Sequence, residues 1–170
     1  MLIQLTLKNY LSFKDETVFS MIASKDKEFL DNNTFNISKN INLLKNVLIY
    51  GPNASGKSNL IRAISFFRYF VLNSSKETQY KDPIPYNPFK LNKGTINKPS
   101  LLEFIFFTND KRYRYGFEIN NKRVVNEWLF ATYKTKESKL FIREGNNFDI
   151  GNKFKEGKNM GDKTRENALF

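Results

Sequence analysis

The sequence predicts a single α/β domain in which one helix accompanies a mixed sheet that continues into an antiparallel meander. Three observations lead to this fold class. A short apolar run at residues 46–50 stops at a glycine and is followed by a helical pattern over residues 58–72. From residue 101 the hydrophobic period changes to two, which is typical of half-buried antiparallel strands. The length of 170 residues is that of one domain.

Residues 2–8 alternate between apolar and mostly polar side chains and predict a strand with one buried face. Residues 9–15 contain the polar and small residues of a turn, and residues 17–22 predict a second strand, antiparallel to the first. The side chains expected on the buried face of the first strand are Ile3, Leu5 and Leu7.

The next region predicts the centre of the fold. Residues 24–46 are polar and rich in Asn and Lys, so we expect a loop with at most a short strand at residues 35–37. The continuous apolar run 46–50 predicts a strand buried on both faces, as in a parallel sheet. Residues 58–72 then predict an amphipathic helix. Its expected apolar stripe consists of Leu60, Ile61, Ala63, Ile64, Phe67 and Val71.

The remainder of the chain divides by composition. Residues 1–72 hold the elements described so far, and the proline-rich residues 73–100 predict a long loop or insertion. Residues 101–150 predict four or five antiparallel strands joined by turns that contain Asn, Asp or Gly. Residues 151–170 are polar until an apolar ending, and we expect the chain to be cut inside an element there.

Composition excludes several classes of function. The chain has no cysteine and no histidine, which excludes a disulfide scaffold, a Cys or His zinc site, a cysteine nucleophile and a histidine-based triad. No apolar run approaches the ~18 residues of a membrane span, and no signal peptide is visible at the N-terminus. We therefore expect a cytoplasmic protein with no membrane partner.

One motif carries chemistry. Residues 51–58, G-P-N-A-S-G-K-S, match G-x-x-x-x-G-K-[ST] in full and lie between the predicted strand and the predicted helix. Gly51 and Gly56 allow the backbone to approach a polyphosphate closely. The start of the helix offers unsatisfied N–H groups and the positive end of its dipole. Lys57 would neutralise the β- and γ-phosphates, and Ser58 would give its hydroxyl to Mg²⁺.

This motif predicts ATP and Mg²⁺ as cofactors. The Asn-Lys-x-Asp sequence that reads guanine in GTPases does not occur, which favours adenine. Ser58 is the predicted metal ligand. The predicted nucleotide-binding residues are Gly51, Pro52, Asn53, Ala54, Ser55, Gly56, Lys57, Ser58 and Asn59.

These residues also carry a family resemblance. The opening I-x-L-x-L-x-N-Y-x-S-F-K-D (residues 3–15), followed by L-I-Y-G-P-N-A-S-G-K-S-N-L-I-R-A-I (residues 48–64), resembles the N-terminal half of ABC-like ATPase heads. The relatives are the RecF, SMC and OLD group, and within it the bacterial AAA-family ATPases tied to abortive infection and phage defence. Similar stretches occur at residues 86–91, 113–118, 126–129 and 164–170.

The resemblance implies an N-terminal lobe, residues 1–170, of one incomplete ATPase head domain. Such heads bind ATP between two head domains of a homodimer, and some carry or recruit a nuclease. By resemblance, the phosphate-binding residues are Asn53, Gly56, Lys57 and Ser58, and Asn53 helps to hold the loop.

Three departures from the family pattern limit what the resemblance implies. No four apolar residues followed by Asp-Asp or Asp-Glu come after Ser58, no glutamine follows residue 79, and Leu11 stands where SMC-type heads often have a basic residue. Glu103, Glu118 and Glu127 fall in alternating strands. We therefore expect no catalytic residue in this chain, which would bind ATP but hydrolyse it only as part of the full-length protein.

The charge distribution supports an alternative. The formal net charge is +11, and residues 111–143 hold nine basic and three acidic side chains. This segment could serve a module that binds a nucleotide or nucleic acid without catalysis. A small complete P-loop kinase fits less well, because a meander differs from the doubly wound sheet of such kinases.

The aromatic residues inside the basic segment are better explained as core. Tyr113 and Tyr115 share a strand face with Phe117 and Ile119. The alternating arginines, Arg112 and Arg114, are therefore expected on the solvent-exposed face. Trp128 is in line with Val124 and Phe130, and we expect it to be core as well.

Overall fold

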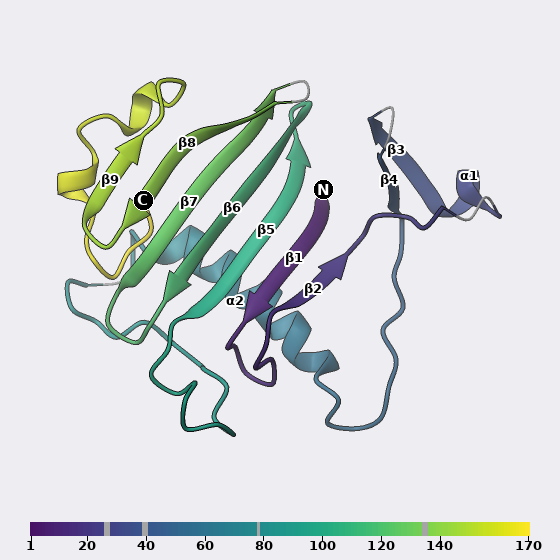
Figure 1. Ribbon diagram of the computed structural model, residues 1–170, viewed down its shortest axis with the longest axis horizontal. Coiled ribbons are helices and arrows are strands. Elements are labelled where there is room, and N and C mark those ends of the chain that lie inside the picture. Colours follow the sequence, from purple (N-terminus) through teal and green to yellow (C-terminus); the bar gives the residue numbers. More distant parts are fainter. Residues whose placement is uncertain (26–27, 39–40, 78, 134–135) are drawn as a thin grey trace.

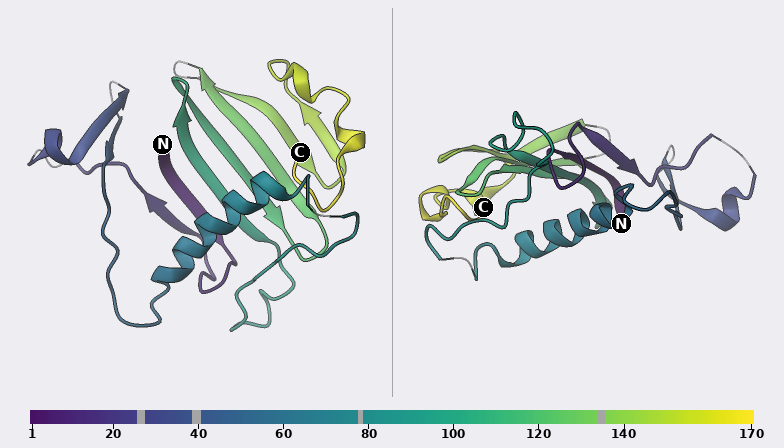
Figure 2. Two further views of the ribbon diagram at one scale, coloured as in Figure 1. Left: turned by 180° about the vertical axis from the view of Figure 1, so that it is seen from behind. Right: turned by 90° about the horizontal axis from the view of Figure 1, so that it is seen from below.

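The computed structural model describes residues 1–25, 28–38, 41–77, 79–133 and 136–170. Figures 1 and 2 show a twisted sheet with one long helix, α2, across one face. The strand order is β2-β1-β5-β6-β7-β8-β9, and β3 and β4 form a separate pair. The strands of the sheet are β1 (Leu2–Lys8), β2 (Thr17–Ser20), β5 (Ser100–Thr108), β6 (Lys111–Ile119), β7 (Val124–Tyr133), β8 (Lys136–Glu144) and β9 (Asn147–Ile150).

In the described part of the chain, six further elements lie outside this sheet, and α2 is the longest of them. They are α1 (Leu30–Asn33), β3 (Thr34–Ser38), β4 (Ile41–Leu44), α2 (Lys57–Asn73) and the 3-10 helices η1 (Lys155–Gly157) and η2 (Gly161–Lys163). Among the described residues, α2 and the other helices lack the length and apolar character needed to cross a membrane.

The core lies between α2 and the sheet. The predicted helix is confirmed, and Leu60, Ala63, Phe67 and Phe70 form its buried face. Phe67 stacks on Phe104 and Phe117, with ring centroids 3.8 and 5.1 Å apart. A buried side chain of this size contributes about 1.5–3 kcal/mol to folding, so this contact fixes the helix on the sheet.

The predicted apolar stripe of the helix is wider than the buried one. Ile61 and Val71 are 56% and 39% exposed, so the prediction that they belong to the buried stripe is wrong. Each follows a buried position, Leu60 or Phe70, and a step of one residue turns the side chain about 100° around the helix.

The antiparallel meander is confirmed as the five strands β5 to β9. Tyr115 and Phe117 belong to the core on the α2 side, with Tyr115 packed at its margin, as expected. Arg114 lies on the opposite face, where its guanidinium covers the ring of Phe130 at 4.3 Å.

The prediction for Trp128 is wrong. Its ring lies across Gly116 on the face opposite α2, and its indole Nε1 donates to Glu103. The reason is a register shift in the β6–β7 pair, where Glu118 pairs with Asn126 but Ile119 pairs with Val124. The extra residue reverses the alternation, so Val124 is core while Trp128 is on the other face.

The predicted strand at residues 46–50 is also wrong. These residues form no strand, and Leu48 and Tyr50 are 89% and 92% exposed. A strand buried on both faces needs a neighbour on each side, and no described residue pairs with this segment. Every pairing among the described strands is antiparallel, so the mixed sheet expected from the sequence is not observed in this part of the chain.

The region predicted as loop 24–46 contains more structure than expected. The short strand at residues 35–37 is confirmed within β3, but β3 also pairs with β4 in a hairpin. Leu43 is fully buried and bridges to Ile22, which connects the hairpin to the end of β2. The polar composition of the segment hid this hairpin, because few of its side chains are buried.

The predicted long loop is confirmed, since the described residues between α2 and β5 form no helix or strand. Asn9, in the left-handed conformation, organises it. Its Nδ2 donates to the carbonyls of Thr95 and Lys98, and its Oδ1 accepts the N–H of Phe89. One side chain after β1 thus positions a loop about 80 residues away in the sequence.

Candidate functional site

Residues 51–58 form a tight loop that leads directly into α2. Gly56 is the N-cap residue of the helix and has φ of 95°, a conformation that L side chains rarely adopt. Ala54 also has positive φ, 64°, which costs a residue with a β-carbon about 1–2 kcal/mol. The loop therefore keeps a specific, partly strained shape at the point where the N–H groups of the helix end are exposed.

Lys57 closes this loop on itself. Its Nζ donates to the carbonyl oxygens of Gly51 at 2.8 Å and Pro52 at 2.7 Å, and it contacts Oγ of Ser55 at 3.4 Å. The ammonium group thus lies over the start of the loop rather than extending into solvent. This arrangement holds one positive charge where the backbone N–H groups of the first helical turn also lie.

Ser12 is a neighbour of the loop that sequence reasoning missed. Its Oγ lies 2.9 Å from the position that a β-carbon on Gly56 would occupy. The turn between β1 and β2 places it there, with a pair of backbone hydrogen bonds between Tyr10 and Phe13. Leu11, the residue singled out from the family pattern, instead donates its N–H to the carbonyl of Asn87.

The other predicted site residues lie on the same loop or the first turn of α2. Pro52, Asn53 and Ser55 are exposed, and Ser58 is exposed directly after Lys57. Asn59 accepts a weak hydrogen bond, 3.4 Å, from the guanidinium of Arg62 one turn further on. All nine predicted residues are thus contiguous and accessible at one end of α2.

The strand carboxylates lie elsewhere. Glu103 accepts hydrogen bonds from Trp128 at 2.6 Å and Arg114 at 3.1 Å on the open face of the sheet. Glu118 accepts from the side chain of Asn126, and Glu127 is buried beside Arg143. Each is engaged by strand neighbours, and none has a hydrogen bond to the described residues of loop 51–58.

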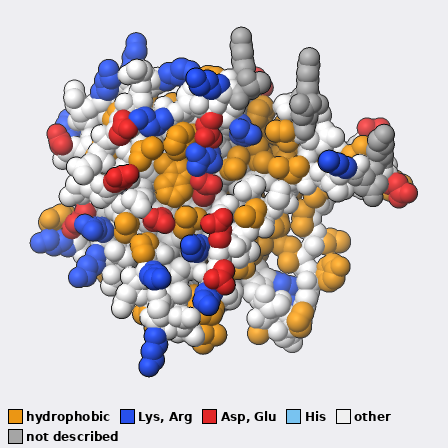
Figure 3. Space-filling model, in the orientation of Figure 1, with side chains coloured by type: hydrophobic (Ala, Val, Ile, Leu, Met, Phe, Trp, Pro, Cys, Tyr) orange, Lys and Arg blue, Asp and Glu red, His pale blue; other side chains and the backbone are white. Residues whose placement is uncertain are grey.

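Three described residues of the basic segment 111–143, Arg114, Lys139 and Arg143, form ion pairs with carboxylates. Arg114 bonds to Glu137 and Glu103, and these interactions raise the pKa of Arg114, while the bond to Arg114 lowers the pKa of Glu137. Lys139 pairs with Asp149 and Arg143 with Glu127. Figure 3 shows the result on the face opposite α2, where acidic and basic side chains surround an apolar centre.

Lys111 of this segment and Lys153 beyond it each have the same aromatic neighbour, Tyr133. The Nζ atoms of Lys111 and Lys153 lie 5.2 and 4.2 Å from the ring centroid of Tyr133. They flank this ring at the end of the sheet where β7 meets β8.

A helix that begins at a glycine-bounded loop and covers a sheet is consistent with a P-loop domain of the AAA class. A family model described as an AAA domain, and linked in that description to the AbiEii toxin and a type IV toxin–antitoxin system, matches residues 47–169. The chain belongs to this family. No curated protein matches the chain. The predicted likeness to AAA-type ATPases of abortive infection is confirmed at this level, and AAA domains generally bind and hydrolyse ATP.

Proposed function

We propose that this chain binds Mg-ATP through residues 51–59, as the N-terminal part of an ATPase head of the RecF, SMC and OLD group. The observation that carries the proposal is the position of Lys57, whose ammonium group is held over the loop by the carbonyls of Gly51 and Pro52. A cation and a helix N-terminus that converge on one exposed loop form an anion site suited to a polyphosphate.

Each loop residue has a role in this proposal. Gly56 gives the loop the positive φ with which its backbone N–H groups can turn toward a phosphate. Lys57 neutralises the β- and γ-phosphates. Ser58, exposed on the first turn of α2, supplies one hydroxyl ligand to Mg²⁺, a hard cation that prefers oxygen. Bound Mg²⁺ would neutralise part of the charge on the phosphates.

Hydrolysis requires further groups. Glu103, Glu118 and Glu127 are all engaged by strand neighbours, so we propose that the chain by itself holds ATP without turnover. Transfer of the γ-phosphoryl group needs an oriented water and stabilisation of developing charge, which gripping the phosphates does not supply. We propose that the full-length protein supplies them, as a homodimer of heads that acts in phage defence with a nuclease partner, by resemblance to the family.

The test is isothermal titration of Mg-ATP into the wild-type chain and two matched variants. Lys57→Ala removes the cation at the start of α2, and Lys76→Ala removes an exposed lysine just beyond the other end of the helix. We expect Lys57→Ala to lose most of the affinity and Lys76→Ala to retain it. Equal affinity in the wild type and a folded Lys57→Ala would overturn the proposal.

A second candidate function rests on Lys111 and Lys153. Cations that flank an aromatic ring are suited to the phosphates and bases of a nucleic acid strand. If this surface binds such a strand, affinity should fall with salt by a log–log slope of about −0.7 per phosphate neutralised. The double variant Lys111→Glu, Lys153→Glu should flatten that slope. Arg114→Glu tests this surface less directly, because Arg114 already pairs with two carboxylates.

A further inference from the structure

Residues 165–170 lie between two parts of the molecule that are distant in sequence. On one side is the C-terminal end of α2, and on the other are the adjacent strands β7 and β8. Figure 1 shows this last segment of the chain beside β8 and over the far end of α2 from loop 51–58. It forms no helix or strand, yet Asn167, Ala168 and Leu169 are buried.

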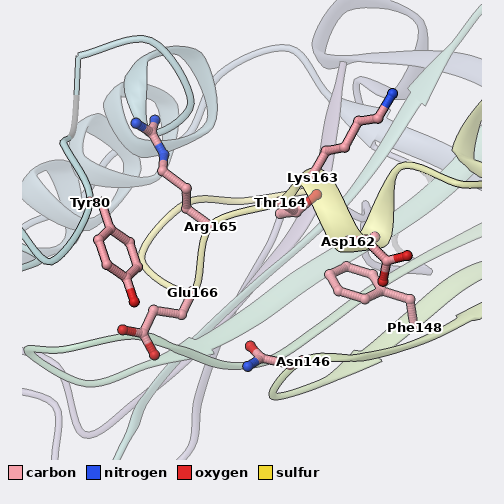
Figure 4. Close-up of a pocket in the computed structure, with 9 residues that line it drawn as sticks. Tyr80, Asn146, Phe148, Asp162, Lys163, Thr164, Arg165 and Glu166 are labelled. Atoms are coloured by element: carbon pink, nitrogen blue, oxygen red, sulfur yellow. The ribbon is translucent and has the colours of Figure 1, made fainter.

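The contacts to α2 cap the end of the helix. Arg165 donates from Nη2 to the carbonyl of Ser75 at 2.8 Å and to that of Ser74 at 3.4 Å. The N–H of Leu169 donates to Oγ of Ser74, which is buried. Figure 4 shows the Arg165 side chain directed toward the helix end, at the rim of a pocket of about 430 Å³. Ser74 is the C-cap residue of α2, so the Arg165 cation lies just beyond the C-terminal end of the helix, where a positive charge favours the dipole.

The contacts to the sheet come from a buried ion pair. Glu127 on β7 and Arg143 on β8 are directly paired in register, and neither has exposed surface. Arg143 Nη1 lies 3.4 Å from Glu127 Oε2 and donates at 2.7 Å to the carbonyl of Ala168. Arg143 Nη2 donates at 3.1 Å to the carbonyl of Arg165, and both Glu127 oxygens accept the N–H of Phe170 at 3.1 Å.

Glu127 and Arg143 therefore interact more closely with the backbone of residues 165–170 than with each other. Burying a carboxylate and a guanidinium is costly unless their hydrogen bonds are satisfied. The ion-pair distance is long. Each group has one short bond elsewhere, from the Tyr115 hydroxyl to Glu127 and from Arg143 to the Gly145 carbonyl, both at 2.8 Å. The other bonds shorter than the ion pair go to the backbone of residues 165–170. Burial raises the pKa of Glu127, whereas the hydrogen bonds from Tyr115 and Phe170 and the adjacent Arg143 guanidinium act in the opposite direction.

The position of α2 determines the position of loop 51–58. The helix is one uninterrupted rod of 17 residues, and loop 51–58 leads into its first turn. The described segment 46–50 before the loop has no strand partner, so it does not fix the loop from the other side. An anchor at the far end of α2 therefore acts on the loop through the helix.

We propose that Glu127 and Arg143 are positioning residues, which clamp residues 165–170 as an anchor for the C-terminal end of α2 and thereby help to hold loop 51–58 in its nucleotide-binding position. The consequence for nucleotide affinity rests on the proposed function. The anchoring itself does not, because it concerns the ligand-free chain.

The experiment compares three variants by hydrogen exchange and by titration with Mg-ATP. Arg143→Met removes one charge of the clamp. Arg165→Ala removes the two side-chain hydrogen bonds to Ser74 and Ser75, while the bond from Leu169 to Ser74 and the buried pair stay in place. This variant remains informative if Arg143→Met does not fold. Arg114→Met breaks two ion pairs on the opposite face of the same sheet and is the control.

We expect Arg165→Ala, and Arg143→Met where it folds, to raise amide exchange at residues 70–77 and 51–59 in the ligand-free chain. Both should weaken Mg-ATP binding by about fivefold or more, the range of ordinary coupling between sites. Arg114→Met should change neither. By reciprocity, Mg-ATP should slow exchange at residues 168–170 in the wild type but not in Lys57→Ala.

Two outcomes would overturn the clamp. Exchange that rises at residues 165–170 alone, with loop exchange and ATP affinity unchanged, would show a local structural role. Unchanged exchange at residues 70–77 would show that the segment does not anchor the helix. If the wild type does not bind Mg-ATP while loop exchange still rises in Arg165→Ala, the proposed function fails and the anchor stands.

Discussion

The hydroxyl oxygen of Ser12 lies 2.9 Å from the point where a β-carbon of Gly56 would stand, although 43 residues separate the two in sequence. Gly56 is thus restricted twice, by this contact and by its φ of 95°. The turn after β1 and the start of α2 form one surface, and a glycine is the residue that allows it.

We predict that Gly56→Ala lowers the free energy of unfolding by about 1–3 kcal/mol, from the backbone strain alone. It should also weaken Mg-ATP binding, since the loop must shift. Urea unfolding and titration measure the two effects. Gly94→Ala is the control, because Gly94 has no positive φ and only the side chain of Asn92 lies near the position of the added β-carbon. Equal stability of the wild type and Gly56→Ala would contradict this geometry.

Ala54 should tolerate the opposite change. Its φ of 64° is strained for alanine and relaxed for glycine, whereas glycine adds flexibility to the unfolded chain. We predict that Ala54→Gly leaves stability unchanged or raises it by up to about 1 kcal/mol, with ATP binding retained. Ala63→Gly, in the buried interior of α2, should instead lose about 1 kcal/mol or more. Thermal unfolding of both variants is the measurement, and a marked loss in Ala54→Gly would argue against the observed loop shape.

At acidic pH, the free energy of unfolding should depend on the protonation of Glu137. Its hydrogen bond from Arg114 lowers its pKa in the folded state, so the unfolded state binds more protons as pH falls. This contribution is present above the unfolded pKa of about 4.3 and is lost as pH falls through the folded pKa. Glu127 has the opposite sign, because its folded pKa is raised by burial.

We therefore predict that the stability difference between the wild type and Glu137→Gln is largest near neutral pH and shrinks below about pH 4. Urea unfolding at a series of pH values measures it. A difference that stays constant down to pH 3 would mean that the Arg114–Glu137 bond does not act through the charge of the carboxylate.

Phosphate release separates binding from turnover. We predict that the 170-residue chain binds Mg-ATP but releases no phosphate above background, whereas the full-length protein does. The reason is that Glu103, Glu118 and Glu127 are engaged by Trp128, Asn126 and Arg143, and none has a hydrogen bond to the described residues of loop 51–58. Robust release from the chain that disappears in Lys57→Ala would reveal a catalytic group among its own residues.

Local patterns predicted most of the fold. The period-two pattern after residue 101 and the helical stripe after residue 58 each depend on neighbours in sequence, and both elements are observed. Trp128 was misplaced because one extra residue in β7 reverses the alternation, and such a bulge leaves no mark in an apolar pattern. Residues 46–50 were misplaced because their apolar character predicts burial, whereas a strand also needs partners to pair with.

The candidate site was predictable only where it is contiguous. Loop 51–58 could be read directly, because its residues follow one another in a known order. Ser12 could not be linked to it, since the contact depends on how the turn after β1 meets α2. Glu127 and Arg143 were also missed, because charged residues in strands usually face water, and their burial depends on the backbone of residues 165–170.

The pairing of β1 with β5 has a consequence for how the chain is made. The meander from β5 to β9 joins neighbours in sequence, whereas β1 ends at Lys8 and its partner begins at Ser100. At about 5–20 residues per second, a ribosome needs roughly 5–20 s to supply that partner after β1 has been synthesised. During this interval only β2 can pair with β1, and the other edge of β1 has no partner. The start of the chain therefore reaches its final pairing only after its later half has been made.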